Sequence, residues 1–505
     1  MGYAVKDLRA IPALAKNFPP SSAQPSSIFH FSGVTPQSTE TTRRVLTEND
    51  QRYDMWYSPP IRFAHNHFVH SALARYSLGA SPALLQRDWE SERGQHAALD
   101  PAEDGRIENV PGLPDTITRE NWVDSRWLGH KDAYSRYLAF FHNEVARLGP
   151  EKVLEQYIFS HEANSGSGTQ GPRMIIALAA GLVHPFIHVG YGLEFNDPVI
   201  LAEGLAQACC CALESAAALY PDGWPHNGLP APREPSKPLI QLYREFTERA
   251  DLDPGPYDTN ILINARLRNF LTPEHVAGVQ GLVARWDLSD MSDKGWKARH
   301  QELAWLTTLI TGATTRPGYN CRVDFFLMHL LTSSLFIPCY MAALPEHHRR
   351  TTLQTYALTV FQVLATRGKP KLYLDFAMSA SANPSGPLTR AKNGEGNANP
   401  WLEIVDNALI ANESHVPKSI RSLVYYSQLY GSTPAGGVPG AHDDAGKEAI
   451  RGLGSVDGSL FVRVAGKIMT ATGWEKDGES HRGWDRSALG WDGAWANERY
   501  DEAKL

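Results

Sequence analysis

Apolar residues recur every three or four positions through most of this chain, which is the spacing of helices with one buried face. Signals of helix boundaries bracket these segments. Ser81-Pro82 introduces one helix, Gly149-Pro150 ends another, and Asn196-Asp197-Pro198 has the form of a cap with proline in the first turn. We therefore predict helices at 83–93, 131–148, 198–220, 301–311, 323–343, 351–366, 401–410 and 416–429.

The predicted fold class is all-α. Alternation of apolar and polar residues, which is typical of strands, is scarce, and no rhythm of strand and helix recurs. We expect a single large helical body with long loops at 101–125, 221–238 and 376–400.

Composition divides the chain into three parts. Residues 1–45 are rich in Pro, Ser and Thr and are expected to form an extended N-terminal arm. Residues 46–430 form the helical body that would carry a catalytic site. Residues 431–505 begin with the Gly-rich stretch 431–446 and are expected to be a Gly-rich linker and a C-terminal segment that packs on the body.

The compartment is expected to be reducing and cytoplasmic. The five cysteines include three in a row, Cys209–Cys211, and form neither a disulfide framework nor a C-x-x-C pair. The first residues lack the continuous apolar core of a secretory signal. The apolar run 325–344 is interrupted by polar residues, so we interpret it as a buried helix. The ending Ala503-Lys504-Leu505 resembles a peroxisomal address, which is the alternative localisation.

Charge argues against polyanionic partners. The chain has 48 Lys and Arg against 55 Asp and Glu, a formal charge of −7, so neither nucleic acid nor a membrane surface is an expected partner. The 13 Trp, 19 Tyr and 18 Phe leave room for an aromatic-lined pocket and a small aromatic substrate. The sequence does not predict the oligomeric state.

Histidine is the residue type with the most informative pattern. There are 19 His against 5 Cys, so a bound metal would have nitrogen ligands. His67 and His70 are three apart, and on a helix they project from the same side, whereas His65 would point elsewhere. His184 and His188 are four apart and could chelate one cation, and the proline between them, Pro185, is acceptable only near a helix start.

Three further polar residues lie in apolar helical segments. His329 stands alone in its segment, and His415 precedes Lys418 by three positions. A buried imidazole must be paired, and each one alone is most simply a satisfied core residue. Six together favour a shared metal centre, with Fe, Zn, Cu and Ni all open. Candidate carboxylate partners or ligands are Glu194, Asp324, Glu403, Asp406 and Glu413.

Lys418 has two interpretations. As an ammonium it has no lone pair for a metal, so near a cation it must be deprotonated or carbamylated by carbon dioxide. Otherwise it is an ordinary exposed lysine.

The other sequence motifs do not support a nucleotide-binding, hydrolase or thiol site. Residues 166–171 spell G-x-G-x-x-G, with Glu194 downstream, but no strand precedes them and Pro172 follows, so a loop is the better interpretation than a dinucleotide site. The chain has no G-x-S-x-G, H-E-x-x-H or phosphate-loop motif. The Cys209–Cys211 run is better explained by helix packing than by a thiol site.

Five ordered strings resemble one family: NHFVHSALARYSLGAS, HPFIHVGYGLEF, DFFLMHLLTSSLF, ESHVPKSIRSL and WDRSALGWDGAW. They resemble the questin oxidase-like family of fungal polyketide oxygenases. The resemblance implies oxygen insertion into, or cleavage of, an anthraquinone-type ring. The family's histidine motifs fall on His67 and His70, His184 and His188, and His329, and its H-x-x-K motif falls on His415 and Lys418. The chain departs from the family mainly at the Ser/Gly stretch 164–171.

Together these points predict a non-haem iron mono- or dioxygenase of secondary metabolism. Fe(II) would be held by several of the histidines with carbamylated Lys418 or a carboxylate, and O2 would attack the ring. Tyr191 and Tyr76 are candidate catalytic partners of the phenol or of oxygen. One alternative is a metal-free Baeyer–Villiger monooxygenase with NADPH as an external reductant. Another is a His-rich metal hydrolase or a non-catalytic metal-binding protein.

Overall fold

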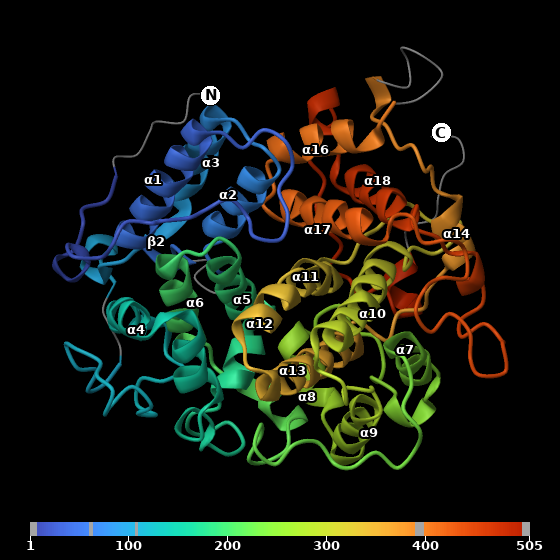
Figure 1. Cartoon of the computed structure of the whole chain (residues 1–505), viewed down its shortest axis with the longest axis horizontal. Helices are drawn as coiled ribbons and strands as arrows, with labels where there is room; N and C mark the ends of the chain where they lie inside the picture. Colours follow the sequence, from blue (N-terminus) through green and yellow to red (C-terminus); the bar gives the residue numbers. More distant parts are fainter. Residues whose placement is uncertain (1–7, 60–63, 107–109, 389–397, 497–505) are drawn as a thin grey trace. The chain divides into compact units, whose positions relative to one another are not determined.

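The structure is a computed structural model that describes residues 8–59, 64–106, 110–388 and 398–496. The chain is mostly helical over these ranges (Figure 1). The sheet that they contain is one antiparallel pair of short strands, β1 (Tyr53–Tyr57) and β2 (His96–Ala98). The all-α prediction is confirmed.

The chain divides into two compact units. The first unit comprises 1–214, 222–227 and 336–348, and the second unit comprises 215–221, 228–335 and 349–505. These groupings do not follow the boundaries at 45 and 430 that composition suggested, and the three-part division stays a prediction. We describe each unit by itself.

The first unit is built around a long apolar helix, α5. Its packing partners within the unit include α2, α6 and α12, and α4 packs on α6. Asp197 caps α6 through Val199 N at 2.9 Å, as the sequence predicts. The helix ends at Cys210 rather than at Tyr220, and a 3-10 turn follows. The helices of this unit are α1 (Pro36–Arg52), α2 (Phe68–Ser77), α3 (Pro82–Glu92), α4 (Tyr134–Leu154), α5 (Met174–Glu194), α6 (Pro198–Cys210) and α12 (Ile337–Ala343).

The first α-helix begins inside residues 1–45, the range predicted for the N-terminal arm. Helix α1 begins at Pro36, within the predicted arm, because Thr35 and Ser38 form a reciprocal capping box. The polar composition of this helix is the reason that the sequence pattern did not predict it. Residues 24–27, which precede it, run along the end of α5. Gln24 N donates to Phe195 O at 2.8 Å, and Ser27 N donates to Glu194 O at 3.1 Å.

Helix α5 is interrupted just before its histidines. Gly181, Leu182 and Val183 have φ values of 54°, 55° and 59°, a left-handed conformation that residues with side chains rarely adopt. The helix resumes at His184, so Pro185 lies in a first turn, as predicted. Helix α4 shows the converse: it kinks at Gly149 and continues to Leu154 instead of ending.

The apolar core of the second unit is formed by α10, α11, α17 and α18, which pack on one another. The predicted helix 323–343 is two helices, α11 and α12, because Pro338 starts a new first turn. The helices are α7 (Leu239–Glu248), α8 (Ile263–Phe270), α9 (Pro273–Ala284), α10 (Asp293–Gly312), α11 (Phe325–Ser334), α13 (Glu346–Thr366, which begins in the first unit), α14 (Leu374–Ser379), α16 (Pro400–Ile410), α17 (His415–Tyr430) and α18 (Leu460–Thr472).

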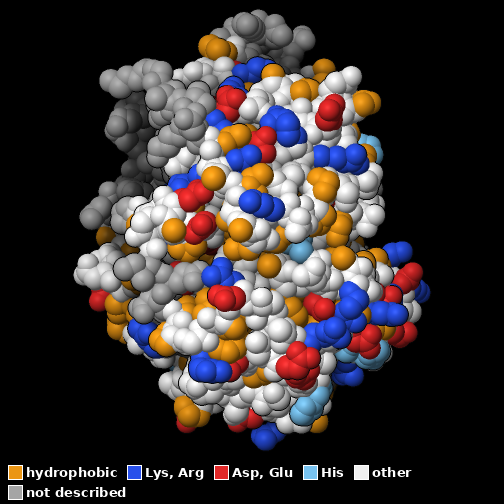
Figure 2. Space-filling view, turned by 90° about the vertical axis from the view of Figure 1, so that its left-hand side faces the viewer, with side chains coloured by type: hydrophobic (Ala, Val, Ile, Leu, Met, Phe, Trp, Pro, Cys, Tyr) orange, Lys and Arg blue, Asp and Glu red, His pale blue; other side chains and the backbone are white. Residues whose placement is uncertain are grey.

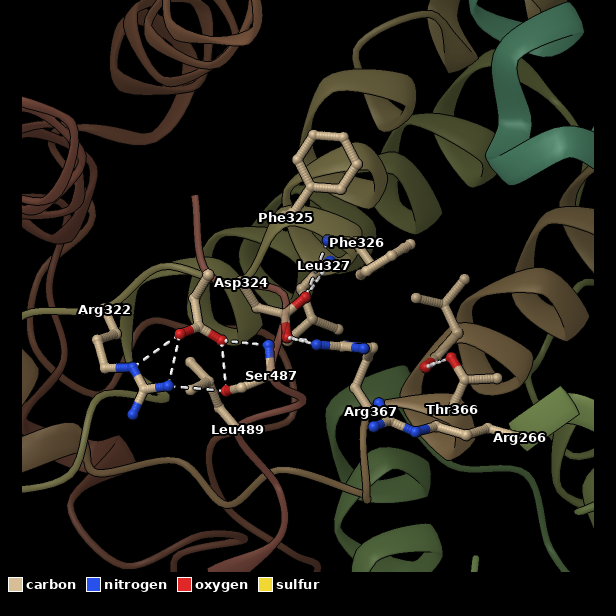
Figure 3. Close-up of polar contacts among 12 residues, drawn as sticks. Arg266, Arg322, Asp324, Phe325, Phe326, Leu327, Thr366, Arg367, Ser487 and Leu489 are labelled. Atoms are coloured by element: carbon tan, nitrogen blue, oxygen red, sulfur yellow. Dashed lines mark hydrogen bonds and ion pairs between the residues drawn. The ribbon is translucent and has the colours of Figure 1, made fainter. Parts of the chain in front are cut away.

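A buried ion pair holds the start of α11. Figure 3 shows Asp324 accepting from the backbone of the helix on one side and from Arg367 on the other. Its Oδ1 caps the helix through Phe326 N at 2.8 Å, and its Oδ2 accepts from Arg367 Nε at 2.8 Å. Arg322, also labelled in Figure 3, pairs with Asp485 of the C-terminal segment.

Two helical stretches have the length and hydropathy of a membrane span, Met174–Glu194 and Phe325–Ala343. Their apolar windows are 89% and 83% buried inside the protein, which is typical of core helices. On the face drawn in Figure 2, Lys and Arg side chains are interspersed with Asp and Glu, in line with the near balance of charge. All five cysteines are free thiols. The C-terminal tripeptide lies outside the described residues.

Candidate functional site

Four of the predicted histidines come together in the first unit. His67 is the residue before α2 and His70 lies in its first turn, while His184 and His188 lie on the resumed half of α5. His67 Nε2 is 2.8 Å from His184 Nε2, and His70 Nε2 is 3.1 Å from His188 Nδ1. All four side chains are buried. Two pairs of nitrogen atoms therefore face each other across α2 and α5.

Neighbouring acceptors fix the orientation of the two α5 imidazoles. His184 Nδ1 donates to Gly181 O at 2.6 Å, and His188 Nε2 donates to Glu203 Oε2 at 2.8 Å. In the neutral tautomers that these bonds select, the lone pairs lie on His184 Nε2 and His188 Nδ1. These are the atoms that face His67 and His70.

Glu203 is a residue that the sequence interpretation missed. It lies on α6, is 2% exposed, and burial raises its pKa while the bond with His188 opposes that rise. It reaches His188 because α6 approaches α5 closely at Gly204, where a Cβ would lie 2.7 Å from Val189 Cγ2. The signal was available: a lone carboxylate in an Ala-rich apolar run needs a buried partner as much as a lone imidazole does.

His65 was predicted to point elsewhere, and that prediction is wrong. Its ring stacks on His184 with centroids 4.2 Å apart, and burial lowers the pKa of His65 to about 3. The helical spacing argument does not apply to it, because α2 starts only at Phe68.

The two predicted tyrosines have different surroundings. Tyr191 is buried and stacks on His70 with centroids 5.3 Å apart. The hydroxyl of Tyr76 lies 2.6 Å from Thr39 Oγ1, and its ring packs on Phe195. These contacts bring Tyr191 to the histidine group and link Tyr76 to α1. Their catalytic roles stay predictions.

The other predicted residues form a second group in the second unit. The rings of His329 and His415 lie with centroids 4.9 Å apart. His329 Nδ1 donates to Phe325 O at 2.7 Å, and His415 Nδ1 is hydrogen-bonded to Glu413. Trp484 Nε1 donates to Glu413 at 2.5 Å, so the closing Trp-rich segment also holds this carboxylate.

Electrostatics in this group favour a neutral imidazole beside an ionised carboxylate. Burial, reinforced by Lys418, lowers the pKa of His415. Burial alone would raise the pKa of Glu413, but His415, Trp484 and Lys418 together lower it to about 2. Lys418 is 2% exposed, so the interpretation as an ordinary exposed lysine is wrong.

Among the five candidate carboxylates, Glu413 alone has a described bond to a predicted histidine. The others have other partners. They are Glu194 with Ser26, Asp324 with Arg367, Glu403 with Gly386 N, and Asp406 with Lys476.

The donor chemistry of the buried histidines fits a nitrogen-ligated metal. A metal-binding histidine usually donates the N–H of one ring nitrogen to a carbonyl or carboxylate and binds the metal through the lone pair of the other nitrogen. The buried donors come in pairs, and a single ion shared by all six histidines stays a prediction. In the described part of the chain, three donors within 4.8 Å of one another occur at Glu155, His347 and His348, of which two are exposed.

Comparisons with known proteins place both histidine groups inside one matched region. The family model described as Questin oxidase-like matches residues 64–423. A questin oxidase of Aspergillus terreus is 28% identical over 337 residues, covering 63% of this chain and 69% of that protein. The Baeyer-Villiger monooxygenase dmxR6 of Cryptosporiopsis sp. is 25% identical, covering 64% and 68%. The Baeyer-Villiger oxidase mdpL of Emericella nidulans is 24% identical over 476 residues, covering 91% and 93%.

Proposed function

This chain belongs to the questin oxidase-like family, and on that premise we propose that it is an oxygenase that inserts oxygen into, or cleaves, a ring of an anthraquinone-type polyketide. The enzyme is an oxidoreductase. The observation that carries the proposal is the group of four buried histidines, with their acceptors, inside the matched region.

The side chains of this group suit the chemistry of a phenolic ring. A neutral imidazole accepts the proton of a substrate phenol near neutral pH, because its ordinary pKa is about 6.5. The resulting phenolate is electron-rich at the ring carbons that oxygen attacks. Tyr191 stacks on His70 and keeps that imidazole in place.

A more specific proposal concerns the metal that would supply electrons to O2. We propose that Fe(II) is held by nitrogen atoms of His67, His70, His184 and His188. His329 and His415 form a separate donor pair within the second unit. Bound Fe(II) would supply electrons to O2 at a site with open positions. The support is the donor set and its fixed tautomers.

Lys418 belongs to the same proposal. Its Nζ would first lose a proton to become a neutral amine, and would then add to carbon dioxide with loss of a second proton, giving a carbamate whose oxygens bind a cation. Its burial beside His415 supports this. We expect activity to fall in buffer stripped of carbon dioxide and to return with bicarbonate. Activity indifferent to bicarbonate would leave Lys418 a structural lysine.

A second candidate function is a metal-free Baeyer–Villiger monooxygenase. The names of dmxR6 and mdpL favour it. In that reaction one oxygen atom enters the ring, the other leaves as water, and NADPH supplies the two electrons. The same histidines would then act as proton acceptors only.

The deciding experiment is metal analysis combined with oxygen uptake, using a panel of hydroxyanthraquinones with and without NADPH. The protein should carry the double substitution His347→Ala and His348→Ala, because the exposed Glu155 group could collect adventitious metal. About one iron per chain with substrate-dependent oxygen uptake supports the iron enzyme.

The other outcomes are equally decisive. Turnover by metal-free protein with NADPH selects the Baeyer–Villiger candidate and ends the iron proposal. Hydrolysis of a substrate without oxygen uptake selects the hydrolase alternative. Absence of oxygen uptake across the panel contradicts the oxygenase proposal itself.

A further inference from the structure

A cavity of about 430 Å³ opens in the first unit beside the loop 166–171. Its rim is polar and exposed, with Ser125, Thr169 and Gln170. Its floor is apolar and buried, and includes Met174, Ala177 and Cys211 from α5 and the end of α6. An apolar floor with a few polar groups at the mouth, in this size range, is typical of small-molecule sites.

The floor of the cavity adjoins the histidine group. Cys211 lines the cavity, and a Cβ built on Gly181 would lie 3.4 Å from Cys211 Sγ and 3.3 Å from His65 Cε1. Gly181 O is also the acceptor that orients His184. Gly181 therefore lies next to Cys211 and His65 and is hydrogen-bonded to His184.

The cavity also contains a buried cation. Arg173 lines it, is 1% exposed, and donates from Nη1 to Gly168 O at 2.8 Å, which ties it to the loop that forms the rim. A guanidinium at an apolar wall favours a ligand with an anionic oxygen, because charge interactions are stronger away from water.

We propose that this cavity is the substrate-binding site, and that it takes a flat, fused-ring phenol as its phenolate. The rings lie on the Met174 and Ala177 floor, the phenolate oxygen faces Arg173, and the reacting edge faces Cys211, which neighbours Gly181. The proposal rests on the proposed function. It also assigns a role to the loop 166–171, whose residues 169–171 line the cavity: this loop sets which ring substituents fit.

Binding of 1,8-dihydroxyanthraquinone, followed by its visible absorption and by calorimetry, tests the proposal. Ala177→Trp fills the floor, and we expect its Kd to rise at least about tenfold, the effect of losing on the order of 1.4 kcal/mol. Ala146→Trp places the same side chain on the exposed face of α4 and should bind as the unmodified protein does. Unsubstituted anthraquinone should bind at least about tenfold more weakly, because it has no phenolate. An unchanged Kd in folded Ala177→Trp would overturn the proposal.

Hydrogen exchange of the unmodified protein gives a test that needs no variant to fold. We expect the ligand to protect amides of 166–177 and 125–130. Protection elsewhere, with none in these segments, overturns the site. Binding in this cavity without oxygen uptake would support the proposed binding site and contradict the proposed oxygenase function. Oxygen uptake unaffected by Ala177→Trp would support the oxygenase function and contradict the proposed binding site.

Discussion

His67 and His184 face each other through their Nε2 atoms at 2.8 Å, although 117 positions separate them in the chain. Because His184 Nδ1 donates to Gly181 O, the Nε2 of His184 carries the lone pair when the ring is neutral. The contact then needs a proton from His67 or a cation between the rings. This pair is therefore a contact within the histidine group that requires a proton or a cation.

Replacing His184 by alanine should remove both activity and metal. We expect His184→Ala to lower substrate-dependent oxygen uptake by about 10²-fold or more, the usual contribution of a general acid–base group, and to lose iron in a metal assay. His30→Ala, at an exposed position, is the control. Iron content and uptake equal to those of the control would make His184 an ordinary core residue.

Glu203 should act through His188 rather than on substrate. Glu203→Gln keeps the size of the side chain but removes the negative charge that holds His188 Nε2–H. Loss of such a partner usually costs about 10- to 100-fold in metal affinity or activity. The matched control is Glu194→Gln, another fully buried carboxylate, which bonds to Ser26 instead of a histidine. Equal effects of the two substitutions would mean that burial alone matters.

The sequence predicted this site where helical spacing holds and failed where it does not. His184 and His188 follow one turn of a real helix, and Pro185 marked its start correctly. His65 precedes its helix, so its place against His184 depends on tertiary packing, which spacing does not describe. Glu203 meets His188 through a close approach of two helices, and one-dimensional periodicity contains no information on which helices touch.

The conformation of Gly181 should be needed for activity as well as stability. Gly181→Ala places a side chain at φ 54° and against His65 and Cys211. We expect the free energy of unfolding to fall by about 1–2 kcal/mol from the backbone strain alone. Substrate-dependent oxygen uptake should fall as well. Gly446→Ala, at φ 75° with nothing within 4 Å, carries the same strain without the contacts. Unfolding experiments should show both losses, and the fall in oxygen uptake should be confined to Gly181→Ala.

The Asp324–Arg367 ion pair should be a large contributor to the stability of the second unit (Figure 3). Asp324→Asn retains a capping side chain for α11 but leaves Arg367, which is 1% exposed, without its counter-charge. Such a loss costs about 3–5 kcal/mol. Asp492→Asn breaks an exposed pair with Arg316, and we expect about 1 kcal/mol or less. Denaturant unfolding measures both, and similar losses would show that the buried pair is not special.

Acid sensitivity of the first unit should come partly from His96. Its side chain is fully buried, and burial lowers its pKa to about 3. The unfolded chain takes up a proton near pH 6.5 and the folded chain does not, so stability is fully present above pH 6.5 and falls as the pH drops. From pH 7 to pH 5 this one histidine should cost about 2 kcal/mol. His96→Phe should reduce the pH dependence of the unfolding free energy by that amount, whereas His30→Phe, at an exposed position, should leave it unchanged. Equal slopes for His96→Phe and the unmodified protein would show that His96 is protonated in the folded state.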